Sequence, residues 1–263
     1  MVLEKVVSIR AAVRKPEWMF VIGGFVSVIS TFIAFLVFPS SVGLFLVFLI
    51  TIAMTPFMVN LMSYEEAETE VQIERRIKLN FFQRHEDMLQ IYAAFFSGII
   101  LSLSILFLIL PEKTVETIFE NQVNEINLIR GNITLPTTFQ EILSNNIGVL
   151  LLSFFFAFLF GSGAIFILAW NASVLASAIG LLAKSIGGVK GLPVAVLTFF
   201  PHGSLEIIAY FIAGIAGGLV SAVVARKRSK WFWVVMKDSS KLMAIAASFL
   251  ILAAIVETAI LSF

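Results

Sequence analysis

Long apolar runs separated by short polar or charged segments dominate the chain. A helix needs about 20 mainly apolar residues to cross the hydrocarbon core of a bilayer. Runs of about this length cover residues 17–38, 44–62, 91–110, 147–170, 204–225 and 242–263. The pattern predicts an all-α, polytopic membrane protein, with one membrane domain over residues 1–263 and the bilayer as its first partner.

The apolar pattern is broken between residues 171 and 200. Ala172–Ile186 is short for a span, the glycine-rich stretch 187–191 interrupts it, and residues 192–200 are fewer still. We interpret this region as a discontinuous or re-entrant helix, a kind of element that lines cavities in membrane proteins. One net crossing here gives seven membrane segments, and a dip that returns gives six.

Lysine and arginine gather in three places: the first fifteen residues, the segment 63–90 and the segment 226–241. The segment 111–146 has only Lys113 and Arg130. Because cytoplasmic loops are enriched in these residues, this bias predicts seven segments in a multi-pass protein of the cell membrane. The N-terminus then lies inside and the C-terminus outside, with Arg76 cytoplasmic and Asn132 extracytoplasmic.

Two polar segments carry their own patterns. In 63–90, glutamates precede arginines and lysines without Gly or Pro, which predicts a charged cytoplasmic helical extension. In 111–146, five apolar residues recur at helical spacing and predict an amphipathic extracytoplasmic segment: Val115, Ile118, Phe119, Val123 and Ile126. A capping-box pattern at Thr138 predicts a second short helix before the fourth span. Basic residues among apolar ones before Pro16 indicate either an amphipathic surface helix or simple orientation charges.

Composition narrows the function classes. The 263 residues are 59% hydrophobic and 13% charged, which excludes a sizeable aqueous catalytic domain. A formal charge of +1 argues against a nucleic-acid partner. The chain has no cysteine, so disulfides, thiol nucleophiles and thiolate metal sites are excluded.

Ionisable residues inside apolar spans are functional candidates by default, and three stand out. His202 and Glu206 are four residues apart and share one helix face, while Glu257 lies in the last span. On the predicted topology all three lie in the outer leaflet, where they could bind a divalent cation such as zinc or manganese, relay protons or hold a partner. The alternatives are that His202 and Glu206 satisfy a helix start and Glu257 reaches the near surface, or that His202 or an asparagine pairs structurally with the glutamates.

Two asparagines and five glycines complete the candidate set. Asn146 and Asn171 stand at the two ends of the predicted fourth span, where asparagines cap helices or line a cavity. Small residues let helices approach closely, within one protein or between copies in a homo-oligomer. The glycines expected at such contacts are Gly161, Gly163, Gly214, Gly217 and Gly218.

Enzyme motifs are incomplete. His85-Glu86 begins like a zinc-protease HExxH motif, but residue 89 is leucine instead of the second histidine. The glycine-rich stretches contain no GK[ST] phosphate-binding loop.

Residues 140–225 resemble the stage II sporulation protein M family. The resemblance lies in Asn145-Asn146 before a Phe-rich span, Phe160-Gly161-Ser162-Gly163, Asn171, and above all Pro201-His202-Gly203-Ser204-Leu205-Glu206. It implies a polytopic scaffold grouped with peptidoglycan-degrading partners in spore formers and not itself a hydrolase. It also places the family motif on His202, Gly203 and Glu206, with weaker matches at Asn146 and Asn171.

These observations lead to three hypotheses. The first is a non-enzymatic membrane protein that scaffolds or localises protein partners through its charged inner extension and acidic outer segment. The second is a transporter or channel for an ion or small solute that uses the His202, Glu206 and Glu257 cluster and the broken 171–200 element. The third is a metal-dependent intramembrane enzyme.

Overall fold

The computed structural model describes residues 8–75, 81–132, 138–161, 163–225 and 229–261, and every regular element in these ranges is helical. In chain order the elements are α2 (Ile9–Arg14), α3 (Glu17–Val37), α4 (Val42–Glu74), α5 (Phe81–Arg84), α6 (Glu86–Ile109), α7 (Glu112–Asn132), α8 (Thr138–Phe160), α9 (Ala164–Ser185), η1 (Gly188–Gly191), α10 (Leu192–Ala225) and α11 (Ser229–Leu261). Among the described helices, seven are long and apolar enough to cross a membrane, namely α3, α4, α6, α8, α9, α10 and α11. The predicted all-α fold with seven membrane segments is confirmed.

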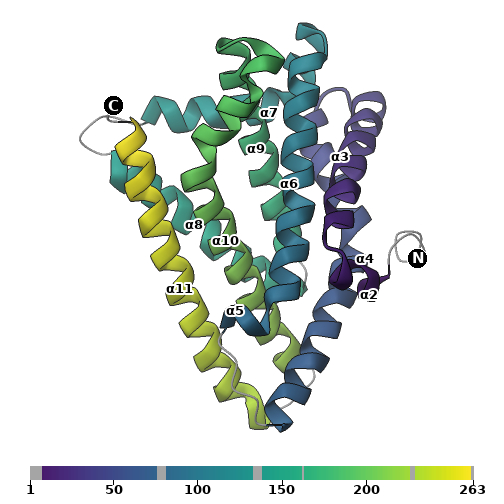
Figure 1. Cartoon of the computed structure of the whole chain (residues 1–263), viewed down its shortest axis with the longest axis vertical. Helices are drawn as coiled ribbons and strands as arrows, with labels where there is room; N and C mark the ends of the chain where they lie inside the picture. The colour runs from purple at the N-terminus through teal and green to yellow at the C-terminus, as the bar shows by residue number, and fades with distance from the viewer. Residues whose placement is uncertain (1–7, 76–80, 133–137, 162, 226–228, 262–263) are drawn as a thin grey trace.

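The seven helices run alternately up and down the long axis of the molecule (Figure 1). The turn between α9 and α10 and the C-terminal end of α11 lie in the upper part of the view, whereas α4 and α10 end at the bottom. We call these the upper and lower ends. Arg76 lies outside the described residues, so the predicted difference between Arg76 and Asn132 remains a prediction.

The prediction of a broken element at 171–200 is wrong. Instead of a discontinuous helix, α9 and α10 are two continuous helices, each long enough to span the membrane. The glycine-rich stretch forms the turn between them, where Gly187 and Gly188 have φ values of 126° and 68° that disfavour other residues. The break in the chain comes earlier, at Gly161 with φ 68°, so the fourth span ends at Phe160 and not at Trp170.

The described residues of the segment 111–146 form the amphipathic helix α7 and the first turns of α8. In α7, Val115, Ile118, Phe119 and Ile126 are buried, and Val123 packs against the same core. The predicted second short helix is not separate, because residues from Thr138 onward belong to α8 and continue through the apolar run. The α7 helix lies across the upper part of the bundle (Figure 1).

A buried glutamine fixes α7 to two membrane helices. Gln122 is fully buried, and its Nε2 donates to the carbonyl of Gly43 on α4 at 3.1 Å and to Ser173 Oγ on α9 at 3.1 Å. A side chain at position 43 would collide with the Gln122 carboxamide. Glycine at 43 therefore allows α7 to dock, and Lys184 and Glu112 add an exposed ion pair between α9 and α7.

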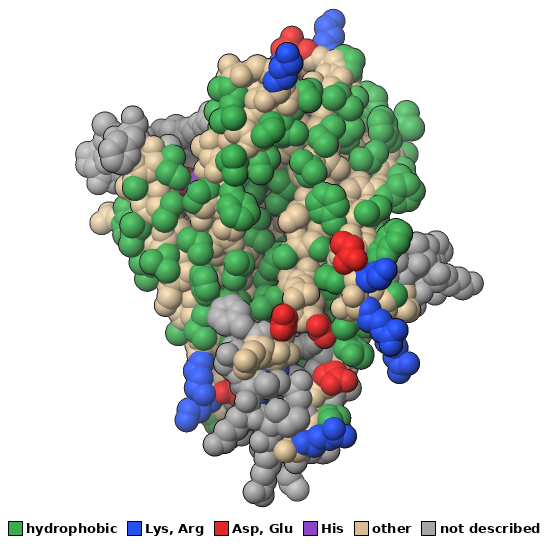
Figure 2. All heavy atoms as spheres, in the orientation of Figure 1, with side chains coloured by type: hydrophobic (Ala, Val, Ile, Leu, Met, Phe, Trp, Pro, Cys, Tyr) green, Lys and Arg blue, Asp and Glu red, His purple; other side chains and the backbone are tan. Residues whose placement is uncertain are grey.

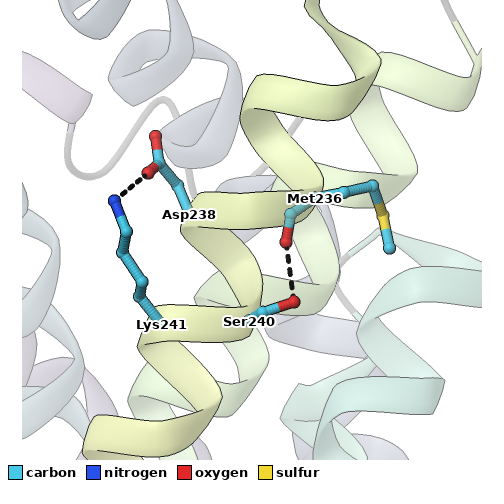
Figure 3. A network of polar contacts seen from close by, with 4 residues as sticks. All are labelled: Met236, Asp238, Ser240 and Lys241. Carbon is cyan, nitrogen blue, oxygen red and sulfur yellow. Dashed lines mark hydrogen bonds and ion pairs between the residues drawn. The ribbon is translucent and has the colours of Figure 1, made fainter.

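Charged side chains gather at the lower end of the molecule, and hydrophobic ones cover the middle and upper part of the same face (Figure 2). The α4 helix continues past its apolar span, which ends at Tyr64, as far as Glu74. The α11 helix likewise begins before its apolar span, which starts at Val235. In the first turns of the α11 span, Lys241 pairs with Asp238 and Ser240 donates to the carbonyl of Met236 (Figure 3).

The α3 and α6 helices pack closely through reciprocal glycines. Gly23 faces the carbonyl of Phe95, and Gly98 faces the carbonyl of Phe20, so a Cβ at either glycine would collide with backbone. Ser27 Oγ and Ser102 Oγ are joined by a 2.6 Å hydrogen bond across this interface. Close contact of this kind holds helices together where lipid supplies no hydrophobic drive between them.

Candidate functional site

The candidate site lies between α8, α10 and α11, which pack against one another. On α10, His202, Glu206 and Tyr210 follow at intervals of four residues and so form one stripe along the helix. On α8, Asn146 belongs to the buried face together with Leu150 and Ser153. The regular helical spacing of both elements thus brings polar side chains to one interface inside an apolar layer.

A directed hydrogen-bond chain crosses this interface. Tyr210 donates its hydroxyl hydrogen to Asn146 Oδ1 at 3.1 Å, and Asn146 Nδ2 donates to Glu206 Oε1 at 2.7 Å. Asn146 is 6% exposed and Tyr210 3%. Both ends of the amide are used, so the chain has one direction, from the phenol through the amide to the carboxyl group.

Glu257 on α11 lies near this chain. It lies within electrostatic range of Glu206 and Tyr210, whereas no hydrogen bond in the described part of the molecule joins the two glutamates. Both glutamates are partly buried. Two ionised carboxylates close together in an apolar layer carry a repulsive and desolvation cost, which a shared proton or a bound cation relieves.

His202 is buried but is not joined to the glutamates. It is 6% exposed, its Nδ1 has no hydrogen-bond partner, and its ring lies 5.8 Å from that of Phe199. The alternative in which His202 and Glu206 satisfy a helix start is wrong, because α10 begins at Leu192 and both residues lie well inside it.

A comparison with known protein families identifies the family of this chain. The family model described as "SpoIIM: Stage II sporulation protein M" matches residues 19–260. The chain belongs to the stage II sporulation protein M family. No curated protein and no solved structure matches significantly. The predicted family is therefore confirmed, and the match extends beyond residues 140–225 to nearly the whole chain.

In this SpoIIM-family protein, the Pro201-His202-Gly203-Ser204-Leu205-Glu206 element lies inside α10. Pro201 lacks an N–H and leaves one helix carbonyl without its usual partner, which membrane helices tolerate within a bundle. Gly203 faces Leu175 of α9, where a Cβ would make ordinary van der Waals contact at 3.7 Å. The element thus sets His202 and Glu206 one turn apart on the inward side of the helix.

The expected three-ligand metal site is not formed. No group of three His, Cys, Asp or Glu side chains in the described parts of the SpoIIM-family protein could hold a metal ion. No hydrogen bond or ion pair of the described residues joins His202 to Glu206 or to Glu257. The divalent-cation hypothesis for His202, Glu206 and Glu257 acting together therefore does not fit the geometry.

The two asparagines have different surroundings. Asn146 is part of the site, but it lies inside α8 and does not cap the start of this helix. Asn171 also lies inside a helix, α9, where its Nδ2 donates to the Ile167 carbonyl of its own helix at 2.8 Å. The structure brings Asn146 to the glutamates and gives Asn171 no comparable contact across helices.

The five candidate glycines also differ in their surroundings: four lie at packing contacts and one at a turn. Gly217 faces the Phe154 carbonyl of α8, Gly214 faces Ala164 of α9, and Gly218 faces Met62 of α4. Gly163 lies against the Phe156 carbonyl at the α8–α9 turn. Gly161 has nothing within 4 Å of a Cβ and supplies the left-handed turn instead of a packing contact.

Tyr210 was not among the sequence candidates, although a signal for it was present. It lies four residues after Glu206, on the face that already carries His202. In an apolar run a tyrosine is ordinarily interpreted as part of the core, and only the structure shows its hydroxyl bonded to Asn146.

Proposed function

We propose that this SpoIIM-family protein is a membrane transporter or channel that binds a proton or a small cation at Glu206 and Glu257. The observation that carries the proposal is the 2.7 Å contact between Asn146 Nδ2 and Glu206 Oε1, with the charge of Glu257 beside it. Carboxyl groups are costly inside a bilayer and are retained where a pathway or relay needs them. Helix packing alone does not need them, because the α3–α6 interface uses glycine and serine.

The burial of the site supports a small ligand. Asn146, Tyr210 and His202 are each at most 6% exposed, so the surrounding side chains leave little room for an organic solute. The two glutamates are the partly exposed members of the cluster. A proton or a single ion fits these surroundings.

Proteoliposomes provide the test. A trapped pH-sensitive dye reports proton uptake driven by a potassium diffusion potential, and parallel assays follow sodium and calcium. Wild-type protein should move one of these ions, and Glu206→Gln should abolish the flux. Glu116→Gln, on the exposed face of α7, is the matched control and should retain it. Equal ion flux in vesicles with and without the protein would contradict the transport proposal.

Scaffolding of partner proteins is a second candidate function, favoured by a different observation. The α4 helix continues for a further stretch beyond its apolar span, to Glu74, on the lower side where charged side chains gather. An extension of this kind offers a surface to a soluble partner. Co-purification of a partner that is lost on deletion of residues 65–85, with ion flux unchanged, supports scaffolding; a partner retained after the deletion argues against a role for the extension.

A further inference from the structure

We infer that Tyr210 is a specificity-determining residue, which turns the oxygen of Asn146 away from Glu206 and so makes this a proton site and not a metal-cation site. The inference rests on the proposed function and names the ligand of the same site. Its starting observation is the orientation of one amide group between two helices.

An asparagine side chain offers an oxygen acceptor at one end and an N–H donor at the other. Here the donor end faces Glu206 Oε1 and the acceptor end receives the Tyr210 hydroxyl hydrogen. In the reverse orientation, Asn146 Oδ1 would face the carboxyl oxygen, and the buried Tyr210 hydroxyl would lose the acceptor it uses in the described structure. Tyr210 therefore holds the amide in the donor orientation.

This orientation decides what Glu206 can bind. Sodium, calcium and manganese ions bind through several oxygen ligands, and an amide N–H cannot serve as one. Because Asn146 Nδ2 donates to Glu206 Oε1, the Asn146 amide presents hydrogen to this position and would repel a metal cation instead of coordinating it. A proton needs no set of oxygen ligands, and the second oxygen of Glu206, which does not contact the Asn146 amide, can carry one.

The surroundings add no compensating ligand. His202 shares the stripe on α10, but no hydrogen bond or ion pair of the described residues joins it to either carboxyl group. The acidic oxygen ligands of this cluster are thus the two carboxyl groups, and the Asn146 amide presents an N–H to one of them. Removing the Tyr210 hydroxyl frees Asn146 to turn and present its oxygen, which adds a ligand for a cation.

Chemical labelling of the full-length protein in detergent tests this assignment without relying on flux. Dicyclohexylcarbodiimide reacts with protonated carboxyl groups in apolar surroundings, and mass spectrometry locates the product at Glu206 or Glu257. Wild-type protein should be labelled, and sodium, calcium or manganese ions should not slow the reaction. Glu206→Gln and Glu257→Gln assign the labelled position.

Tyr210→Phe is the decisive variant, since it keeps the ring and removes the hydroxyl. Labelling of this variant should become sensitive to added cations, slowing by about tenfold, because one added contact to a charged group is worth roughly that factor. Tyr92→Phe is the matched control: Tyr92 is also buried, and it packs on the Phe211 ring and does not belong to the described hydrogen-bond chain through Asn146. It should behave as wild type.

Three results would overturn the inference: no labelling of wild-type protein, protection of wild-type protein by a cation, or identical behaviour of Tyr210→Phe and Tyr92→Phe. Failure of the proposed function is distinguishable from these. If vesicles show no ion flux while the labelling pattern is as expected, transport is wrong and the proton assignment stands. If flux of a metal cation is found and the cation also protects, transport stands and the proton assignment is wrong.

Discussion

Two helix interfaces in this protein use the same close packing but differ in their polar groups. At α3–α6, Gly23 and Gly98 each face a backbone carbonyl, and at α8–α10 Gly217 does the same. The polar partners at α3–α6 are the hydroxyls of Ser27 and Ser102. At α8–α10 they are an amide, a phenol and a carboxyl group.

The two interfaces differ in whether their polar groups depend on the partner helix for hydrogen bonds. Ser27 and Ser102 each have a carbonyl of their own helix within hydrogen-bond distance, at 2.9 Å and 2.7 Å, so either hydroxyl can donate locally when it does not donate to the other serine. Asn146 and Glu206 have no such local alternative among the described contacts, because each is satisfied across the interface. The α3–α6 interface is therefore explained by packing alone, whereas the α8–α10 interface carries groups that packing does not require.

The largest expected effect concerns the feature that both interfaces share, the packing of a glycine against a backbone carbonyl. Gly98→Leu should destabilise the folded protein by about 3 kcal/mol, at the upper end of overpacking costs, because its side chain would meet the Phe20 carbonyl. Gly217→Leu should act similarly at α8–α10. Thermal melting in detergent measures both, with Gly148→Leu as the control, since nothing lies within 4 Å of a Cβ there. Equal melting of Gly98→Leu and Gly148→Leu would contradict the packing described for α3–α6.

Next in size is the loss of the Asn146 amide. Asn146→Ala should cost about 2 kcal/mol, since it leaves Glu206 without its donor and Tyr210 without its acceptor. Combined with Tyr210→Phe, the two changes should cost less than their sum, because they remove parts of one chain. Strict additivity of the two melting shifts would show that the chain does not act as a unit.

A smaller effect separates two substitutions of Glu257. Glu257→Gln should be milder than Glu257→Ala by about 1 kcal/mol, because the Gln amide preserves the hydrogen-bonding capacity and the volume of the side chain, which alanine removes. Chemical denaturation in mixed micelles compares the two. If alanine and glutamine variants unfold alike, Glu257 contributes nothing at Glu206 and only reaches toward the surface.

The smallest effect is expected at the hydroxyl pair. Ser102→Ala should cost only about 0.6 kcal/mol, an average value for hydrogen bonds between membrane helices. Ser27 then keeps its bond to the Gly24 carbonyl. A loss as large as that of Asn146→Ala, measured in the same detergent, would remove the distinction between the two interfaces.

The number of spans was predictable because it depends on the length of apolar runs. The position of the break between the fourth and fifth spans was not predictable, and Gly161 and Gly187 show why. Both occur in apolar or glycine-rich stretches, but composition does not reveal which glycine adopts a positive φ. Gly161 looked like a packing residue in a long run from Ile147 to Trp170, and it is in fact the turn that divides this run between two spans.

The sequence allowed the ionisable residues of the site to be predicted, but it did not allow their arrangement to be predicted. Glu206 and Glu257 stand out because carboxyl groups are rare in spans, and the structure places them near one another. The exclusion of His202 and the inclusion of Tyr210 depend on side-chain directions across three helices, which the spacing along one helix does not specify. Gln122 was likewise missed, since a glutamine in an amphipathic segment resembles any other polar position.

The Gln122 contact sets an order for assembly of the protein in the membrane. Its two partners lie on either side of it in the chain, Gly43 well before and Ser173 well after. As chains emerge from the ribosome in sequence, α7 can meet α4 early but cannot complete its contacts until α9 has been inserted. Until then Gln122 lacks one of its two acceptors, so α7 can complete its contacts only after α9 is inserted, although α7 is made before four of the seven spans.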